Sequence, residues 1–196
     1  KCRAWPAPTL APVGEHGLPM SPAVAAPVLA EIWSTLETLT DPEIPVITLR
    51  EMGILRDVRT NADGTLEVVI TPTYSGCPAM GQIEDDIVAT LAAQGMPARV
   101  VTQLAPAWTT DWMSEAAREK LRAYGIAPPR CSRSEGGEPP GSALRFVARA
   151  TRNEPVPCPL CGSSETTEIS HFGSTACKAQ YRCLACMEPF DYFKPY

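Results

Sequence analysis

Two Cys-X-X-Cys pairs near the carboxyl end constrain this chain more than any other feature of its sequence. The first pair is Cys158 and Cys161, and the second, beyond residues 162–182, is Cys183 and Cys186. In such a knuckle two thiolates converge on one ion, and two knuckles complete a tetrahedral site of four sulfurs. A segment of about forty residues is too short to bury a sufficient core, so bound metal is expected to fold it.

The distribution of the cysteines favours a metal site over disulfides. Of the 8 cysteines, most lie between residues 158 and 186, whereas disulfide scaffolds spread their cysteines over the whole fold. The expected metal is zinc, because no third short-spaced cysteine pair indicates an iron–sulfur cluster. Cys177 is a substitute ligand, a reactive or cluster-carrying thiol, or a small buried residue. His171 is expected at the surface or in packing, and no role is assigned to Cys2 or Cys131.

A solitary cysteine, Cys77, follows a predicted strand that ends at Ile70 and precedes a predicted helix. Pro78 suits the first helical position, where its missing N–H would be unpaired anyway. A thiol at a helix N-terminus is stabilised as the thiolate, the form that binds metal or attacks an electrophile. The alternative is that Cys77 is a small buried hydrophobic residue.

Polar side chains accompany this thiol along the sequence. Hydroxyl groups that could hydrogen-bond an anionic sulfur or a bound cluster precede it at Thr71, Thr73, Tyr74 and Ser75. Two carboxylates, Asp41 and Glu43, lie in a rigid proline-containing loop at residues 40–45. Either could complete a metal site or receive a proton, or Asp41 simply begins a proline turn.

Composition and motifs exclude several function classes. The formal net charge of −5 argues against non-specific binding of nucleic acid. No apolar run has the length of a membrane span, and the first residues lack the apolar stretch of a secretory signal, so a cytoplasmic protein is expected. The sequence holds only two histidines, His16 and His171, so Cys77 lacks the nearby base that a cysteine hydrolase needs. No phosphate-binding glycine loop is present.

The apolar spacing predicts an α+β domain over residues 23–126, in which helices pack on a small mixed sheet. Its expected order is helix, strand, strand, helix, strand, helix. The corresponding ranges are 23–39 (the helix starting near Ala26), 54–59, 66–70, 77–94, 98–104 and 114–124, with a hairpin turn at 61–64. A flexible arm at 1–22 is expected before this domain. A linker at 127–156 and a zinc-ribbon-like β module at 157–196 are expected after it.

Several segments resemble known families. Over about residues 25–126 this chain resembles the MIP18 (DUF59) family of iron–sulfur cluster assembly proteins. The motifs that carry this resemblance lie at 41–46, 49–58 and 71–79. The D-subunit family of phenylacetyl-CoA epoxidases resembles it at 106–113, 172–179 and 181–194.

The resemblance implies an accessory role in aerobic phenylacetate breakdown in the bacterial cytoplasm. Other subunits of the phenylacetyl-CoA epoxidase complex form the oxygenase and the reductase, and iron–sulfur assembly proteins are further implied partners. A second copy of the chain is a candidate partner. The residues that carry over as the assembly site are Asp41, Glu43, Thr73 and Cys77, and those that carry over as metal ligands are Cys158, Cys161, Cys183 and Cys186, with Cys177 as a further candidate.

Three hypotheses follow. In the first, the chain is a maturation factor that transiently holds iron or an iron–sulfur cluster at Cys77 and delivers it to the oxygenase or reductase subunit. In the second, it is a structural or regulatory subunit that stays bound to the oxygenase. In the third, it is a thiol enzyme that uses Cys77 or Cys177, which a thiol pKa near the ordinary value of roughly 8.5 would argue against. The chain is not expected to be catalytic by itself.

Overall fold

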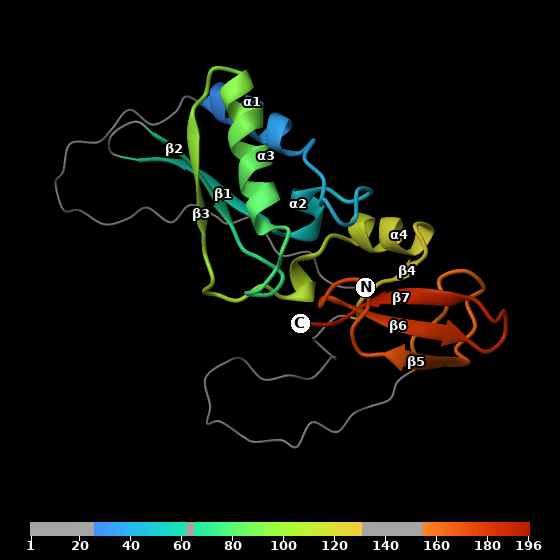
Figure 1. The fold of residues 1–196 in the computed structure, drawn as a ribbon. Coiled ribbons are helices and arrows are strands. Elements are labelled where there is room, and N and C mark those ends of the chain that lie inside the picture. Colours follow the sequence, from blue (N-terminus) through green and yellow to red (C-terminus); the bar gives the residue numbers. More distant parts are fainter. Residues whose placement is uncertain (1–25, 62–64, 131–154) are drawn as a thin grey trace, which may run out of the picture. The chain divides into compact units, whose positions relative to one another are not determined.

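The computed structural model describes residues 26–61, 65–130 and 155–196 (Figure 1). The chain divides into two units, one formed by Lys1–Lys120 with Tyr196 and the other by Leu121–Pro195. The domain boundaries expected from composition stay predictions. The expected arm at 1–22 and most of the expected linker lie outside the described residues.

The first unit contains most of the predicted elements. The α+β class and the order of these elements are confirmed, whereas α2 and the 3₁₀ helix η1 were not predicted. The bounds are α1 Ala26–Leu36, α2 Leu49–Met52, β1 Leu55–Thr60, β2 Leu66–Ile70, α3 Met80–Ala93, β3 Ala98–Thr102, η1 Thr110–Trp112 and α4 Glu115–Ala123, of which α4 continues into the second unit. No helix among the described residues combines the length and the hydropathy that a membrane crossing needs.

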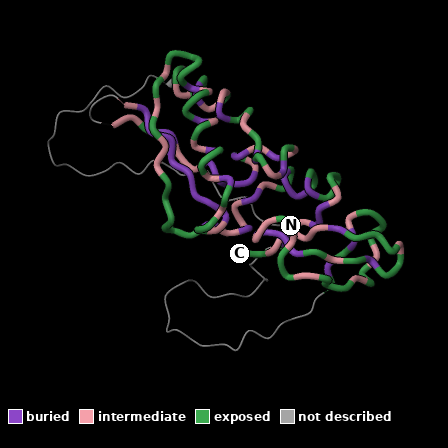
Figure 2. Tube along the Cα trace, viewed as in Figure 1, coloured by how far each residue is buried: buried purple, intermediate pink, exposed green. Residues whose placement is uncertain are grey.

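Strand β2 lies at the centre of a three-stranded sheet with the order β1-β2-β3. It pairs antiparallel with β1 and parallel with β3. All of its residues are buried, and Figure 2 shows the strand as a continuous buried stretch. The parallel pair needs a crossover connection, which α3 supplies.

Helix α3 covers one face of this sheet (Figure 1). Its buried residues Ile83, Ile87 and Leu91 recur every fourth position, the spacing that places side chains on one helical face. The Thr102 hydroxyl at the end of β3 donates a hydrogen bond of 2.9 Å to Glu84 of α3. Helix α1 packs against α3, and its Ile32 and Leu36 are fully buried.

The short helix α2 is held by its caps rather than by its length. Thr48 and Glu51 form a capping box, in which each side chain accepts a hydrogen bond from the backbone N–H of the other residue. Gly53 ends the helix in the left-handed conformation with φ of 77°. A helix of 4 residues shows no apolar period, so the sequence pattern did not predict it.

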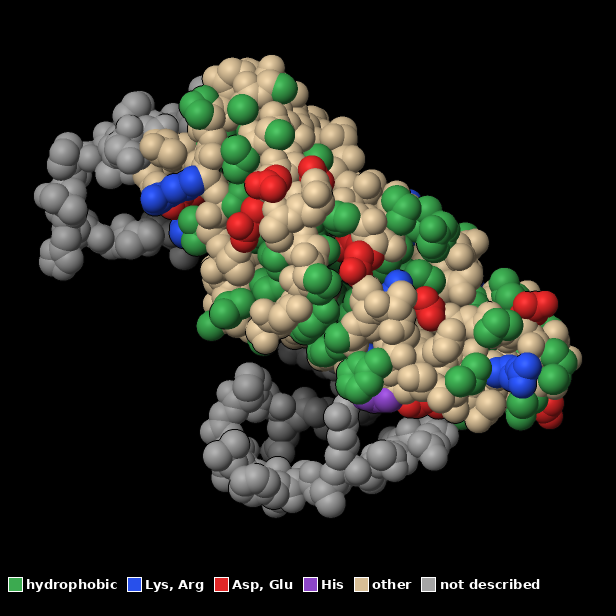
Figure 3. Space-filling view, viewed as in Figure 1, with side chains coloured by type: hydrophobic (Ala, Val, Ile, Leu, Met, Phe, Trp, Pro, Cys, Tyr) green, Lys and Arg blue, Asp and Glu red, His purple; other side chains and the backbone are tan. Residues whose placement is uncertain are grey.

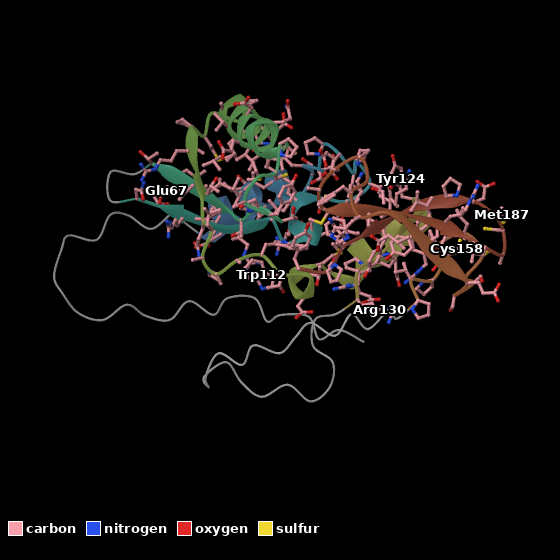
Figure 4. The ribbon with its side chains drawn as sticks, turned by 60° about the horizontal axis from the view of Figure 1, so that its bottom comes forward. Glu67, Trp112, Tyr124, Arg130, Cys158 and Met187 are labelled. Atoms are coloured by element: carbon pink, nitrogen blue, oxygen red, sulfur yellow. The ribbon has the colours of Figure 1, made fainter. Side chains whose placement is uncertain are left out.

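A charged ladder crosses the sheet at Glu67, which Figure 4 labels. Arg59 on β1 and Arg99 on β3 lie directly opposite Glu67 in the strand register. Both arginines form ion pairs with its carboxylate, and the Arg59 Nε lies 3.0 Å from Oε2. A hydrogen bond from the Asn61 side chain, together with the two arginines, holds the pKa of Glu67 below its usual range although the residue is buried.

The second unit is built on a four-stranded sheet with the order β4-β7-β6-β5. Strands β5, β6 and β7 form an antiparallel meander, and the short β4 pairs parallel with β7. The bounds are β4 Ile126–Ala127, β5 Thr166–Ser170, β6 Lys178–Cys183 and β7 Pro189–Phe193. The β module is therefore confirmed, and β4 is an addition that the sequence pattern did not predict.

The core of this second unit is small and contains ligand cysteines. Cys158 and Cys183 are buried with Ala127, Val156 and Phe190, and Tyr181, Cys186 and Tyr192 pack against them. Because sulfur atoms replace the usual aliphatic side chains here, the stability of this core depends on what the sulfurs bind.

We predict that Gly53→Ala destabilises the first unit strongly. A Cβ atom at Gly53 would lie 2.8 Å from the Cβ of Trp112 and 2.9 Å from its carbonyl oxygen, in a backbone conformation that already disfavours alanine. The expected loss in the free energy of unfolding is about 3 kcal/mol, measured by urea denaturation of the full chain.

Gly95→Ala is the matched control. Gly95 also has a positive φ, of 73°, but a Cβ there would meet no atom within 4 Å. Only the backbone strain remains, so the expected loss is about 1 kcal/mol. Equal losses in the two variants would contradict the proposed role of the Gly53–Trp112 approach.

Candidate functional site

The four paired cysteines converge on one point in the second unit. Their Sγ atoms all lie within 4.8 Å of one another. Two of the separations join the two knuckles: 3.5 Å between Cys161 and Cys183, and 3.9 Å between Cys158 and Cys186. A disulfide would need about 2.05 Å. Tetrahedral ligands at the usual zinc–sulfur distance lie about 3.8 Å apart, so the arrangement fits one metal ion and not a pair of disulfides.

The two knuckles repeat the same backbone pattern. The N–H of Cys158 donates to the carbonyl oxygen of Ser163 at 2.9 Å, and the N–H of Cys183 donates to that of Glu188 at 3.0 Å. The Cys186 N–H points at the Cys183 sulfur, 3.4 Å away. Each sulfur pair is therefore positioned by a closed hydrogen-bonded turn, which directs its sulfurs toward one point.

The thiols of this cluster ionise unequally. The backbone N–H groups of Cys186 and Ala185 outweigh burial and lower the pKa of Cys183 to about 6. At Cys186 the backbone N–H of Glu188 favours the thiolate, but burial and the three other thiols outweigh it and raise the pKa to about 12. At Cys161 a hydrogen bond from the backbone of Ser163 favours the thiolate. The Cys183 thiol and burial outweigh it and raise the pKa of Cys161. A divalent cation supplies the positive charge that lets all four ionise together.

Cys177 and His171 lie outside the four-sulfur group. Cys177 is buried just before β6, and its sulfur lies 3.0 Å from the Thr175 hydroxyl. His171 is exposed, with Nδ1 3.3 Å from a carboxylate oxygen of Glu168. The residues that would hold a metal ion in this unit are therefore the four paired cysteines.

In the first unit, Cys77 lies in the loop that joins β2 to α3, and it is partly exposed. The predicted helix start at Pro78 is wrong, because α3 begins at Met80 with Ala79 as its N-cap. The Met80 N–H bonds the Cys77 carbonyl oxygen at 3.4 Å, and the first full helical turn closes from Ile83 to Ala79 at 2.9 Å. A separate turn thus comes between the thiol and the helix, and it places Cys77 just before the helical N-terminus.

Three segments meet at the end of the sheet where the loop between β2 and α3 begins. The Thr71 N–H donates to the carbonyl oxygen of Ile54, just before β1, at 2.9 Å. The Gln103 N–H, just after β3, donates to the carbonyl oxygen of Ile70 at 2.8 Å. The carboxyl ends of the parallel strands β2 and β3 therefore lie together, which is where open α/β sheets place their ligands.

The other predicted site residues are placed in two loops. Thr73 is buried in the Cys77 loop itself. Asp41 is also buried, and its Oδ1 accepts the N–H groups of Glu43 at 2.8 Å and Ile44 at 2.9 Å. The carboxylate of Asp41 thereby closes its own turn, as Asx turns do. Glu43 is partly buried in the same loop.

Met187 was not among the predicted site residues. It follows Cys186 as Gly162 follows Cys161, and both residues have left-handed backbones, with φ of 66° and 76°. The signal that could have revealed it is the comparison of the two knuckles, which are Cys-Pro-Leu-Cys-Gly and Cys-Leu-Ala-Cys-Met.

We predict that metal affinity falls as the pH is lowered, and falls more steeply below about 6. Above that pH the Cys183 thiol is already ionised in the folded unit, whereas below it the metal must displace this proton as well. The folded pKa lies below the ordinary thiol pKa of roughly 8.5, so the thiolate contributes its full stabilisation above that pH. This contribution is lost as the pH falls through about 6.

The measurement is competition for the metal with a chromogenic chelator over a series of pH values. Cys77→Ser should give the same profile as the wild type, because that thiol lies in the other unit. A metal affinity independent of pH would contradict thiolate ligation.

Comparison with known families separates the same two regions. Residues 29–103 match a family described as iron–sulfur cluster assembly protein. Residues 145–194 match the PaaD zinc beta ribbon domain. The Fe-S protein maturation auxiliary factor of Porphyromonas gingivalis is 33% identical over 93 residues, which is 46% of this chain and 88% of that protein. The DUF59 domain structure from Bacillus anthracis is 26% identical and covers 47% of this chain and 89% of its own, with a TM-score of 0.43.

One relative spans both regions. The Escherichia coli K12 protein named as the D subunit of 1,2-phenylacetyl-CoA epoxidase is 47% identical over 172 residues. The match covers 87% of this chain and 95% of the relative, so it extends over both regions in one chain of similar length. This chain therefore belongs to the family of phenylacetyl-CoA epoxidase D subunits, which join an iron–sulfur assembly domain to a zinc ribbon.

Proposed function

We propose that this chain is an accessory subunit that holds iron or an iron–sulfur cluster transiently and delivers it to the oxygenase or reductase subunit of a phenylacetyl-CoA epoxidase in the bacterial cytoplasm. The observation that carries the proposal is the partly exposed Cys77, in the loop at the carboxyl ends of two parallel strands. Two relatives named as Fe-S protein maturation auxiliary factors support it. The match of residues 29–103, which contain this loop, to the iron–sulfur cluster assembly family supports it as well.

The chemistry of Cys77 suits transfer better than storage. Iron and iron–sulfur clusters take thiolate ligands, and stable clusters have about four of them. A site with one thiolate leaves coordination positions open, which a donor and then a recipient protein can fill. The proposed polar group of this site is Thr73, which lies in the same loop as the thiol. The proposed carboxylate groups are Asp41 and Glu43, from the loop at residues 40–45.

The second unit holds its metal differently. All four ligands are supplied by the chain and their backbone turns are closed, so the ion has no position open to a substrate. We assign this site to a permanent zinc ion with a structural role, because the donor set is four sulfurs and the zinc ribbon family matches here.

The test is Cys77→Ser in a host that expresses the whole epoxidase and lacks the wild-type chain. The variant should fold and keep its zinc, while the iron content of the purified oxygenase or reductase falls by about tenfold or more, since a metal ligand is lost. Iron is measured by elemental analysis after anaerobic purification.

Gln82→Ala is the matched control for this test. It changes an exposed polar residue of α3, outside the proposed site, and should leave the iron content unchanged. Normal iron loading in the presence of Cys77→Ser would refute the delivery role.

A second candidate function is that of a permanent structural or regulatory subunit. The name of the Escherichia coli relative, which calls it a subunit, favours it. In that case the chain co-purifies with the oxygenase at fixed stoichiometry, and fully metallated oxygenase and reductase remain inactive until the chain is added. For a delivery factor we expect the opposite: metallated subunits are active without it.

A further inference from the structure

The two metal knuckles present large apolar side chains to the surface. Leu160 is 59% exposed, Leu184 is 53% exposed and Met187 is 56% exposed. Each is the direct neighbour in sequence of a ligand cysteine, and two of those ligands, Cys161 and Cys183, have sulfurs 3.5 Å apart. The three side chains therefore border one metal site, and we call them the knuckle surface.

Met187 has a backbone conformation that is unusual for methionine. Its φ of 66° lies in the left-handed region, which disfavours any residue with a Cβ, and the equivalent position of the other knuckle is Gly162. The side chain is mostly exposed, so packing in the core does not explain its presence. Backbone strain kept at such a position points to a role for the side chain outside the fold. Figure 4 labels Met187 at the end of the second unit, farther out than Cys158.

The knuckle surface has an acidic border. Glu188 follows Met187 and is exposed, and the Leu184 N–H donates to the carbonyl oxygen of the exposed Glu165 at 2.7 Å. Four thiolates around a divalent ion add a net charge of about −2. Arg182 on β6, next in sequence to Cys183, is an exposed residue of the opposite charge. Figure 3 shows hydrophobic side chains among charged ones at this end of the ribbon.

We propose that the knuckle surface is the docking site for the epoxidase subunit that receives the metal. The complementary face on that subunit is an apolar hollow bordered by Lys or Arg, because the surface here is apolar with an acidic border. Leu and Met side chains are flexible and fill irregular hollows well. This inference rests on the proposed delivery function.

The test measures the binding of the full chain to the purified oxygenase and reductase subunits, each separately, by titration calorimetry. Met187→Gly relieves the backbone strain and deletes the side chain. It should keep its zinc and its thermal midpoint, at or above that of the wild type, yet bind the recipient subunit at least tenfold more weakly. Leu184→Ser should weaken binding similarly, and the wild-type affinity should fall as salt is raised.

Ile169→Ser is the matched control, because Ile169 is 54% exposed but lies on β5, away from the ligand positions in the sequence. Its affinity should equal that of the wild type. The proposal is overturned if Met187→Gly and Leu184→Ser bind normally, if Ile169→Ser weakens binding equally, or if neither subunit binds the wild-type chain. It is also overturned if light scattering shows that the variants lose only self-association.

The Cys77→Ser variant separates this inference from the proposed function. It should bind the recipient subunit with wild-type affinity and deliver no iron. Normal delivery by Cys77→Ser would refute the transfer role. The binding measurements on Met187→Gly and Leu184→Ser test the docking site independently of that result.

Discussion

The pairing of β2 with a strand on each side is the constraint on which the first unit depends. Hydrogen bonds to β1 and β3 satisfy both edges of β2, and all of its side chains are buried. The parallel neighbour requires α3 as a crossover, and the crossover in turn requires a loop between β2 and the helix. Cys77 lies in that loop, so the position of the thiol follows from the sheet topology.

The second unit differs from the first, because its sheet has too little apolar volume for a large core. Two of its ligand cysteines belong to the core itself, next to Val156 and Phe190. Ion binding and core formation are therefore one event in this unit, as in other small metal-folded modules. In the proposed function, an ion that stays bound in one unit and an open thiol in the other use the same side-chain chemistry for opposite purposes.

Local patterns in the sequence predicted most of the fold and the convergence of the four paired cysteines. Helical spacing located α1 and α3, a turn motif located the β1–β2 hairpin, and cysteine spacing located the knuckles. The pattern did not predict α2, which is defined by its caps, or β4, whose partner β7 lies far along the chain. The start of α3 and the left-handed Met187 depend on particular backbone hydrogen bonds and dihedral angles, to which residue spacing is insensitive.

The ladder of Arg59, Glu67 and Arg99 has a consequence for solubility. β1 and β3 are the outer strands of the described sheet, and each carries one of these arginines, whose side chains are more than half exposed. The single carboxylate that pairs with both arginines lies on the central strand and balances one of the two positive charges, so each outer strand presents an exposed charged side chain. Such charges discourage edge-to-edge addition of further strands. The same ion pairs that fix the register also protect the sheet from open-ended aggregation.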